Sequence, residues 1–247
     1  MNTTNTREHP PPYLGADLTD RYARGCRPID VCGLRPGSDG SLAARFWQWT
    51  WPEPERPLQV GAVAAEIGAA RSTMLDGPQG LAARGRRLRA AERACAAAGK
   101  TPDELAELRG PYAGFVRSSV ELFAALHASG IAISPDDCLL GACEYYPGDA
   151  WKRLAGGTLP NKADKEGRRR RRELLTALGV TGLPDRPSHD ANDACLGALL
   201  AAAADSRVPG LGLALVGEPL VIDAAGTLRE GPILVPCAGP RLGPCST

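Results

Sequence analysis

Several residue types that mark common classes of protein are scarce in this sequence. Only three histidines occur in 247 residues, and none of the eight cysteines lies in a Cys-x-x-Cys pair, which disfavours a structural zinc site. A cluster of Cys26 and Cys32 with Cys138 and Cys143 is the remaining alternative of that kind. No apolar run reaches the roughly 20 residues that a helix needs to span a bilayer, so we expect no membrane partner. The formal net charge is +1, and binding to nucleic acid therefore requires a local basic patch.

The two ends of the sequence differ in composition from its middle. Residues 1–12 are polar and proline-rich and lack the pattern of a signal peptide, so we expect a disordered N-terminal arm, reduced cysteines and a cytoplasmic location. The length suits one domain with a sizeable core, which we place at residues 13–236. Residues 237–247 are expected to form a loose tail.

Three strands are predicted before the first helix, at residues 13–19, 29–34 and 44–51, with a strong turn signal at 35–40. Their short connections predict an antiparallel meander. Trp47, Trp49 and Trp51 recur at period two and share one face of the third strand. A stripe of this kind is more often core, or a surface on which a helix packs, than a platform for stacking bases.

The middle of the chain alternates helices with strands. A helix at 60–70 precedes a strand at 73–76, and this crossover predicts a strand parallel to the first. Residues 81–130 are expected to be helical throughout, with helices at 83–98, from 101 and at 112–129. The remaining elements are a strand at 138–146, helices at 164–178 and 188–204, and short strands at 211–216, 220–223 and 233–235.

This order of elements predicts the fold class. Three antiparallel strands, a helix, a strand parallel to the first, another strand and a C-terminal helix form the order of a ribonuclease H-like α/β domain. We therefore expect a mixed sheet, first antiparallel and then parallel, flanked by helices. A helical insertion at about 81–130 and a C-terminal β extension complete the expected domain.

Carboxylates stand at the points where this fold brings elements together. Asp17 and Asp76 end neighbouring strands, which places them about 4.8 Å apart. Asp190 and Asp193 project from one face of the last helix. Four oxygen donors without histidine or thiolate suit Mg²⁺ or Mn²⁺, and we predict that all four are catalytic metal ligands. Glu144 lies one strand further away and is predicted to support the metal or position the substrate.

Each of these acids also has a purely structural interpretation. Asp17 and Asp76 can end strands at ordinary turns. Asp190 and Asp193 can be stabilised by the positive end of the helix dipole, and Ser188 or Asp190 can serve as the N-cap. His189 can assist proton transfer, but a histidine at a helix start is more often a local hydrogen-bonding residue. Their occurrence together is what favours a site.

Six stretches of the chain together form a recognisable set of motifs: residues 15–19, 75–78, 89–92, 144–147, 165–175 and 189–194. This set resembles the motifs of the family labelled domain of unknown function 429. The resemblance runs in the same order from about residue 13 to residue 236. It implies a ribonuclease H-like fold and a predicted nuclease. The spacing of Asp190 and Asp193 is also similar to that of the last-helix acids of Holliday-junction resolvases.

Five successive arginines at 168–172 form the strongest local concentration of positive charge. One interpretation is a solvated surface helix, since a helix spreads such a run around every face. The other is a phosphate-contacting edge. For this edge we predict the nucleic-acid-binding residues Lys165, Arg168, Arg171 and Arg172, and Lys162 just before them adds to the same basic patch.

The function that these features predict is metal-dependent hydrolysis of phosphodiester bonds in DNA or RNA. In such a reaction one cation activates water and a second stabilises the leaving oxygen. A non-catalytic nucleic-acid-binding or scaffold protein of the same fold is the main alternative. A nucleotide-dependent phosphotransferase is a third, but its two-domain architecture does not suit a chain of 247 residues.

Overall fold

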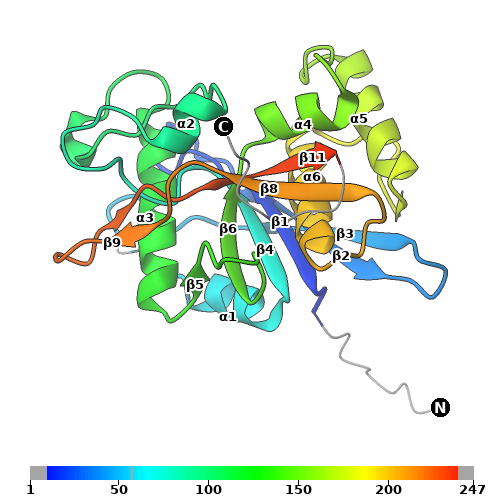
Figure 1. Ribbon diagram of the computed structural model, residues 1–247, viewed down its shortest axis with the longest axis horizontal. Coiled ribbons are helices and arrows are strands. Elements are labelled where there is room, and N and C mark those ends of the chain that lie inside the picture. The colour runs from blue at the N-terminus through cyan, green and yellow to red at the C-terminus, as the bar shows by residue number, and fades with distance from the viewer. Residues whose placement is uncertain (1–9, 57, 239–247) are drawn as a thin grey trace.

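The computed structural model describes residues 10–56 and 58–238. Within them, a sheet of nine strands runs through the molecule, and helices cover both faces (Figure 1). Its strands are β1 (Tyr13–Asp17), β2 (Ile29–Pro36), β3 (Leu42–Trp49), β4 (Ser72–Asp76), β5 (Ala132–Ile133), β6 (Gly141–Tyr145), β7 (Val180–Thr181), β8 (Leu211–Val216) and β11 (Ile233–Ala238).

A separate hairpin and the helices complete the described chain. The hairpin consists of β9 (Val221–Ile222) and β10 (Leu228–Arg229). The helices are α1 (Gly61–Ala69), α2 (Ala90–Ala94), α3 (Ala113–Ala128), α4 (Pro147–Ala155), α5 (Lys165–Ala177) and α6 (His189–Ala204), with one 3-10 turn at Leu105–Glu107.

The order and direction of the strands confirm the expected fold class. The sheet reads β7-β3-β2-β1-β4-β6-β11-β8, and β5 pairs with β6. β1, β2 and β3 form the antiparallel meander. β4 lies parallel to β1, and β6 lies parallel to β4. The central order β3-β2-β1-β4-β6 is thus the mixed arrangement of a ribonuclease H-like domain, and it sets the ends of β1 and β4 side by side.

Each face of the sheet has its own hydrophobic core. On one face α6 packs with α4 and α5, through residues such as Leu199, Trp151 and Leu175. On the other face α1 and α3 contribute residues such as Ile67 and Phe123. Period-two alternation along β1 sends successive side chains to these two cores, because neighbouring residues of a strand point to opposite faces.

The tryptophan stripe packs against a helix, as expected. The indole nitrogens of Trp47 and Trp49 both donate to Glu66 Oε2 of α1 at 3.0 Å. The indole of Trp51 donates to Thr19 Oγ1 at 2.7 Å. The indole N–H groups are therefore satisfied within the fold, as buried tryptophan requires.

The prediction that residues 81–130 are helical throughout is wrong. Only α2, the 3-10 turn and α3 are helical there, and the helix expected at 83–98 is limited to Ala90–Ala94. The backbone N–H groups of Ala83 and Ala90 donate to the carboxylate of Glu230, both at 2.9 Å. Leu81 also forms a bridge to Arg229. These backbone N–H groups thus find hydrogen-bond partners that are distant in the sequence instead of partners within a helix. A local sequence pattern does not reveal such partners.

Two further differences concern the C-terminal half. α4 was not predicted, because its opening Pro147-Gly148-Asp149 has the composition of a turn; proline suits its first turn, and left-handed Gly156 ends it. The tail predicted at 237–247 begins too early, since β11 continues to Ala238, between β6 and β8. Residues 239–247, and residues 1–9 of the predicted N-terminal arm, lie outside the described residues.

Two further observations concern the helices and the cysteines. No helix in residues 10–56 and 58–238 has the length and apolar character needed to cross a membrane. The seven cysteines in the described part of the chain are all free thiols.

Candidate functional site

Gly15 explains how helix α6 reaches Asp17. A Cβ atom on Gly15 would lie only 2.1 Å from the carbonyl oxygen of Ala194 and 2.2 Å from the backbone nitrogen of Ala198. The backbone of α6 therefore lies directly on β1, at a distance that only glycine permits. Since Asp17 shares the face of Gly15, the first turn of α6, with Asp190 and Asp193, is brought onto it.

All five predicted acids line one cavity of about 470 Å³. Asp17 comes from the end of β1, Asp76 from the end of β4 and Glu144 from β6. Asp190 and Asp193 come from the start of α6. Asp76 is mostly buried, and each of the other four is at least nine-tenths buried. The structure thus brings together every acid that the sequence singled out.

The cavity disfavours the ionised forms of Asp17 and Asp76. Burial, followed by the charges of Asp76, Asp193 and Asp190, raises the pKa of Asp17 well above its ordinary value. Burial and the charge of Asp193 raise the pKa of Asp76 to about 8, while Lys162 and a hydrogen bond with Asp17 oppose the rise. Like charges in a low-dielectric setting disfavour one another's ionised form. This pair of acids therefore favours either a shared proton or a bound cation.

Asp190 is held as a carboxylate by its neighbours. Its Oδ2 accepts from Arg27 Nη1 at 2.6 Å, and its Oδ1 lies 2.5 Å from His189 Nδ1. Although burial raises its pKa, a hydrogen bond with Asp17 and the nearby His189 and Arg27 lower it overall. The N-cap of α6 is Ser188, whose hydroxyl accepts from Ala191 N at 2.9 Å. Asp190 is consequently not needed as the cap and faces the cavity.

Asp193 has both carboxylate oxygens occupied by protein donors. Trp151 Nε1 donates to Oδ1 at 2.6 Å, and Lys162 Nζ donates to Oδ2 at 2.7 Å. The Tyr145 hydroxyl donates to the backbone carbonyl of Asp193 at 2.6 Å. The side chain of Asp193 is fully buried, so these bonds compensate a charge that would otherwise be costly.

Glu144 forms a buried ion pair. Its carboxylate accepts from Arg89 Nη2 at 2.5 Å and from Arg89 Nη1 at 2.7 Å, and from the backbone of Gln79 at 3.0 Å. Burial raises the pKa of Glu144, and Arg89 opposes that rise. Arg89 is itself fully buried and also donates to Glu92 at 3.2 Å. Because both oxygens of Glu144 are engaged, its place is beside the cluster of aspartates, where it anchors the segment that follows β4.

The donor chemistry of the cluster fits a hard divalent cation, since it offers only carboxylate oxygens. As the described side chains stand, however, no three histidines, cysteines, aspartates or glutamates are arranged to hold a metal ion. Arg27 and Lys162 take up oxygens of Asp190 and Asp193 instead. Asp17 and Asp76 could therefore bind a cation as they stand. Asp190 and Asp193 could do so after Arg27 or Lys162 moves away from them.

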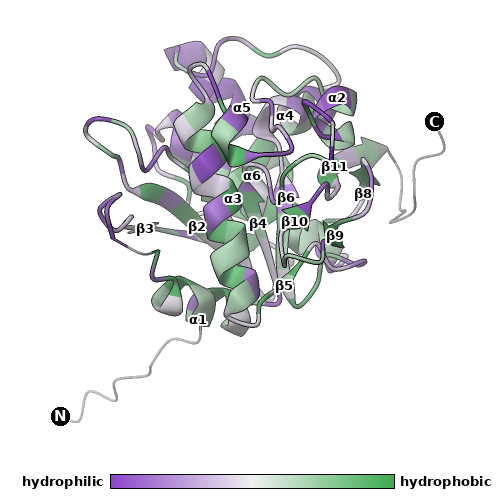
Figure 2. Cartoon of the chain, turned by 90° about the vertical axis from the view of Figure 1, so that its left-hand side faces the viewer, coloured by the Kyte–Doolittle hydropathy of each residue, from purple (hydrophilic) through white to green (hydrophobic). Residues whose placement is uncertain are grey.

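Among the residues predicted to bind nucleic acid, Arg171 differs from the others in its burial. Arg171 is buried, lines the cavity and lies 5.7 Å above the ring of Trp151. Arg168 donates to the carbonyl of Ala163, and Arg172 donates to that of Pro184. Lys165 is exposed. Arg169 and Arg170, outside the predicted set, form ion pairs with Glu166 and Glu173 on the hydrophilic surface of α5 (Figure 2).

The sequence does not indicate that basic and aromatic side chains line the cavity beside the acids. Arg27, Arg89, Tyr146, Trp151 and Lys162 all line it. Trp151 was hidden because α4 was not predicted. Lys162 belongs to the predicted basic patch, but the pattern of basic residues does not distinguish a surface charge from a counter-ion.

Comparison with known proteins gives a family and two similar solved structures. No curated protein matches the chain. The chain is similar to the Thermus thermophilus RuvC structure, with 18% identity and a TM-score of 0.35, over 78% of this chain and 94% of that one. It is also similar to the yeast mitochondrial Holliday junction resolvase Ydc2, with 10% identity and a TM-score of 0.38, over 80% and 78%. Residues 47–219 match the family described as protein of unknown function (DUF429), and the chain belongs to this family.

Proposed function

We propose that this protein is a metal-dependent nuclease that hydrolyses phosphodiester bonds of DNA or RNA. The observation that carries the proposal is the meeting of Asp17 and Asp76, from the adjacent parallel strands β1 and β4, with Asp190 and Asp193 of α6 in one cavity. Acids with a purely structural role are not expected to cluster in this way, because their mutual electrostatic repulsion destabilises the fold. The ends of parallel strands are also where α/β folds place their ligands.

The raised pKa values of Asp17 and Asp76 support a cation as the missing partner. A bound Mg²⁺ or Mn²⁺ would activate water and stabilise the leaving oxygen of a phosphodiester. Asp17 and Asp76 would hold it, and Asp190 would add an oxygen whose ionised form Arg27 and His189 already favour. Asp193 would join them once its contact with Lys162 is released.

The remaining lining of the cavity suits a nucleotide unit. Tyr112, Phe115 and Tyr146 line it together with Arg27, whose side chain is 63% exposed. Aromatic rings accept bases of any sequence by stacking, and an arginine pairs with a phosphate through two parallel hydrogen bonds. We therefore propose that Arg27 contacts the substrate backbone while the tyrosines line the path of a base.

The test is metal binding followed by cleavage. Calorimetry with Mn²⁺ and Mg²⁺ on wild type and Asp17→Asn is followed by incubation with labelled single-stranded, duplex and branched DNA and RNA. We expect Asp17→Asn to lower both metal affinity and cleavage by at least about a hundredfold, as loss of a metal ligand does. Its stability should change little or increase, because one repulsive charge is removed.

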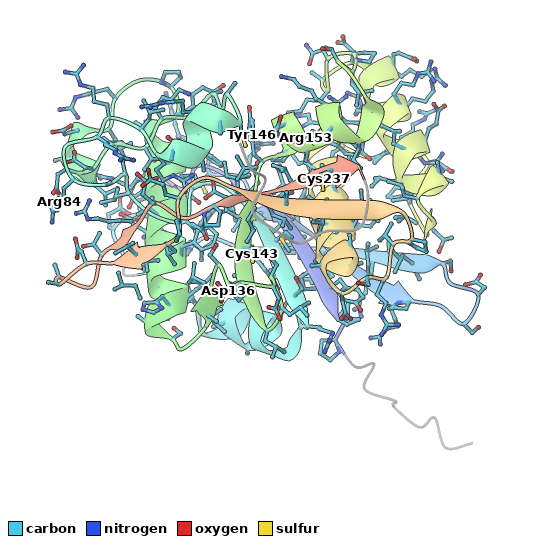
Figure 3. The ribbon with its side chains drawn as sticks, viewed as in Figure 1. Arg84, Asp136, Cys143, Tyr146, Arg153 and Cys237 are labelled. Carbon is cyan, nitrogen blue, oxygen red and sulfur yellow. The ribbon has the colours of Figure 1, made fainter. Side chains whose placement is uncertain are left out.

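Asp136→Asn is the matched control. Asp136 is exposed before β6, whereas Tyr146 at the cavity follows β6, and the two lie at opposite ends of this strand (Figure 3). This variant should keep wild-type binding and cleavage. Full metal-dependent cleavage by Asp17→Asn would refute the proposal, and the absence of metal binding in wild type would favour the scaffold alternative.

A further inference from the structure

Lys162 occupies an unusual position for a lysine of a surface loop. Its Nζ lies 2.7 Å from Oδ2 of the fully buried Asp193, and its own side chain is 45% exposed. Its charge also acts on Asp17 and Asp76, where it opposes the rise of both pKa values. One ammonium group therefore contacts Asp193 directly and has a weaker, longer-range effect on Asp17 and Asp76.

We infer that Lys162 is the resident counter-ion of the acidic cavity: its ammonium group holds the oxygen of Asp193 that a divalent cation requires, and it leaves Asp193 when the cation is bound. The inference rests on the proposed metal site and deepens it. It states that Lys162 competes with the divalent cation for Asp193 and so sets how tightly the aspartates bind the cation.

Helix α5 fixes the loop that carries Lys162. A Cβ atom on Gly167 would lie only 1.9 Å from the carbonyl oxygen of Asn161, so this loop is seated directly on the helix backbone. Arg171 Nη1 donates to the carbonyl of Pro160 at 2.9 Å. The backbone just before Lys162 is thus held at two consecutive residues, which aims the side chain at α6.

The same helix also fixes the second partner of Asp193. The guanidinium group of Arg171 lies over the ring of Trp151, whose indole nitrogen donates to Asp193 Oδ1. Arg171 therefore supports both hydrogen bonds of Asp193, one through Trp151 and one through the loop of Lys162. This closed set of contacts explains why one arginine of the basic run is buried.

Of the two donors, Lys162 is the one that can leave. Trp151 is 2% exposed and rigidly packed, so its indole has no other partner to reach. Lys162 has a flexible stem with nearly half of its surface in solvent, and water can replace Asp193 as its partner. After release, the ammonium group remains at the cavity, where it can contact a phosphate oxygen of the substrate.

The test compares Mn²⁺ binding by calorimetry, and melting temperature with and without Mn²⁺, in wild type and Lys162→Met. Removal of the competing charge should tighten Mn²⁺ binding by about tenfold or more. The melting temperature of metal-free Lys162→Met should be lower than that of wild type, because the acids lose a counter-ion. The rise in melting temperature on adding Mn²⁺ should be larger than in wild type. Lys152→Met, at an exposed lysine of α4, is the control and should behave as wild type.

Two further variants keep the test decisive. Lys162→Gln retains a donor for Asp193 without the charge, and should tighten Mn²⁺ binding even if Lys162→Met folds poorly. Gly167→Ala changes no charge but displaces the loop, and should shift Mn²⁺ affinity in the same direction.

The outcomes separate this inference from the proposed function. If wild type binds Mn²⁺ and cleaves nucleic acid while both Lys162 variants bind Mn²⁺ equally or more weakly, the inference is wrong and the nuclease stands. If wild type and all variants fail to bind Mn²⁺, the metal site and the role of Lys162 fall together.

Discussion

At the scale of single residues, Asp76 predicts how stability depends on pH. Its pKa is raised from 3.8 to about 8, first by burial and then by Asp193. Between these two values the unfolded chain has lost the proton that the folded chain keeps, so the free energy of unfolding falls as pH rises. Below about pH 4 both states keep the proton, so no stability is lost. Above about pH 8 both states have lost it, so the decrease in the free energy of unfolding is complete.

Urea unfolding at a series of pH values from 4 to 9, in EDTA, measures this slope. Asp76→Asn should flatten it and should be more stable than wild type at pH 8. Saturating Mn²⁺ should have a similar effect on wild type, since a cation replaces the proton. Equal slopes for wild type and Asp76→Asn in EDTA would contradict the assigned shift.

Arg89 gives a second prediction at this scale. Its guanidinium group is fully buried between Glu144 and Glu92, and the pair with Glu144 raises its pKa although burial opposes this. Arg89→Met leaves both carboxylates without a counter-ion, and should lower the free energy of unfolding by about 3–5 kcal/mol. Chemical denaturation gives the value. Arg93→Met, at an exposed arginine of α2, should change it by less than about 0.5 kcal/mol.

At the scale of elements, the contact of β1 with α6 is the most sensitive in the fold. Gly15→Ala places a methyl group 2.1 Å from the backbone of α6, where no side chain can move aside. We expect a loss of about 3 kcal/mol or more in unfolding free energy, the upper end for overpacking, together with weaker Mn²⁺ binding. Gly61→Ala, at the open first position of α1, is the control and should not destabilise the protein. Equal stabilities for the two variants would refute the close approach.

The elements that were predictable from sequence are those whose local pattern agrees with their tertiary setting. β1, β4 and α6 have apolar runs ending in an acid or opening at a serine cap, and each lies within two residues of its predicted bounds. The helix expected at 83–98 has good helical composition, but Arg89 and Glu92 turn inward and distant Glu230 bonds its backbone. Long-range bonds overrode local propensity there.

The same distinction holds for the candidate site. Its acids could be predicted, because strand ends and helix starts are visible in the sequence. Its counter-ions could not, since the partners of Asp190 and Asp193 lie 163 and 31 residues away in the chain. Arg171 was predicted to bind nucleic acid, and the structure places it over Trp151 in the lining of the cavity. Which arginine of the run points inward depends on which face of the helix meets the core.

At the scale of the whole molecule, thiol reactivity offers a test of the fold. Among the seven described cysteines, only Cys26 is exposed, and burial raises the pKa of Cys32 and Cys143 well above the ordinary value. Limited alkylation of the native protein with iodoacetamide, followed by peptide mass spectrometry, should label Cys26 well before these two. Equal labelling of Cys32 or Cys143 would contradict the packing of β2 and β6.

The hydrogen bond from Trp151 to Asp193 makes the protein its own optical probe. The indoles of Trp47 and Trp49 bind Glu66 and that of Trp51 binds Thr19, so Trp151 alone among the four tryptophans is hydrogen-bonded to a carboxylate of the cavity. Indole emission responds to a neighbouring charge. A variant that keeps Trp151 as its single tryptophan would therefore report cation binding without any label. Its emission would change when the single positive charge of Lys162 beside Asp193 is replaced by the double charge of the cation.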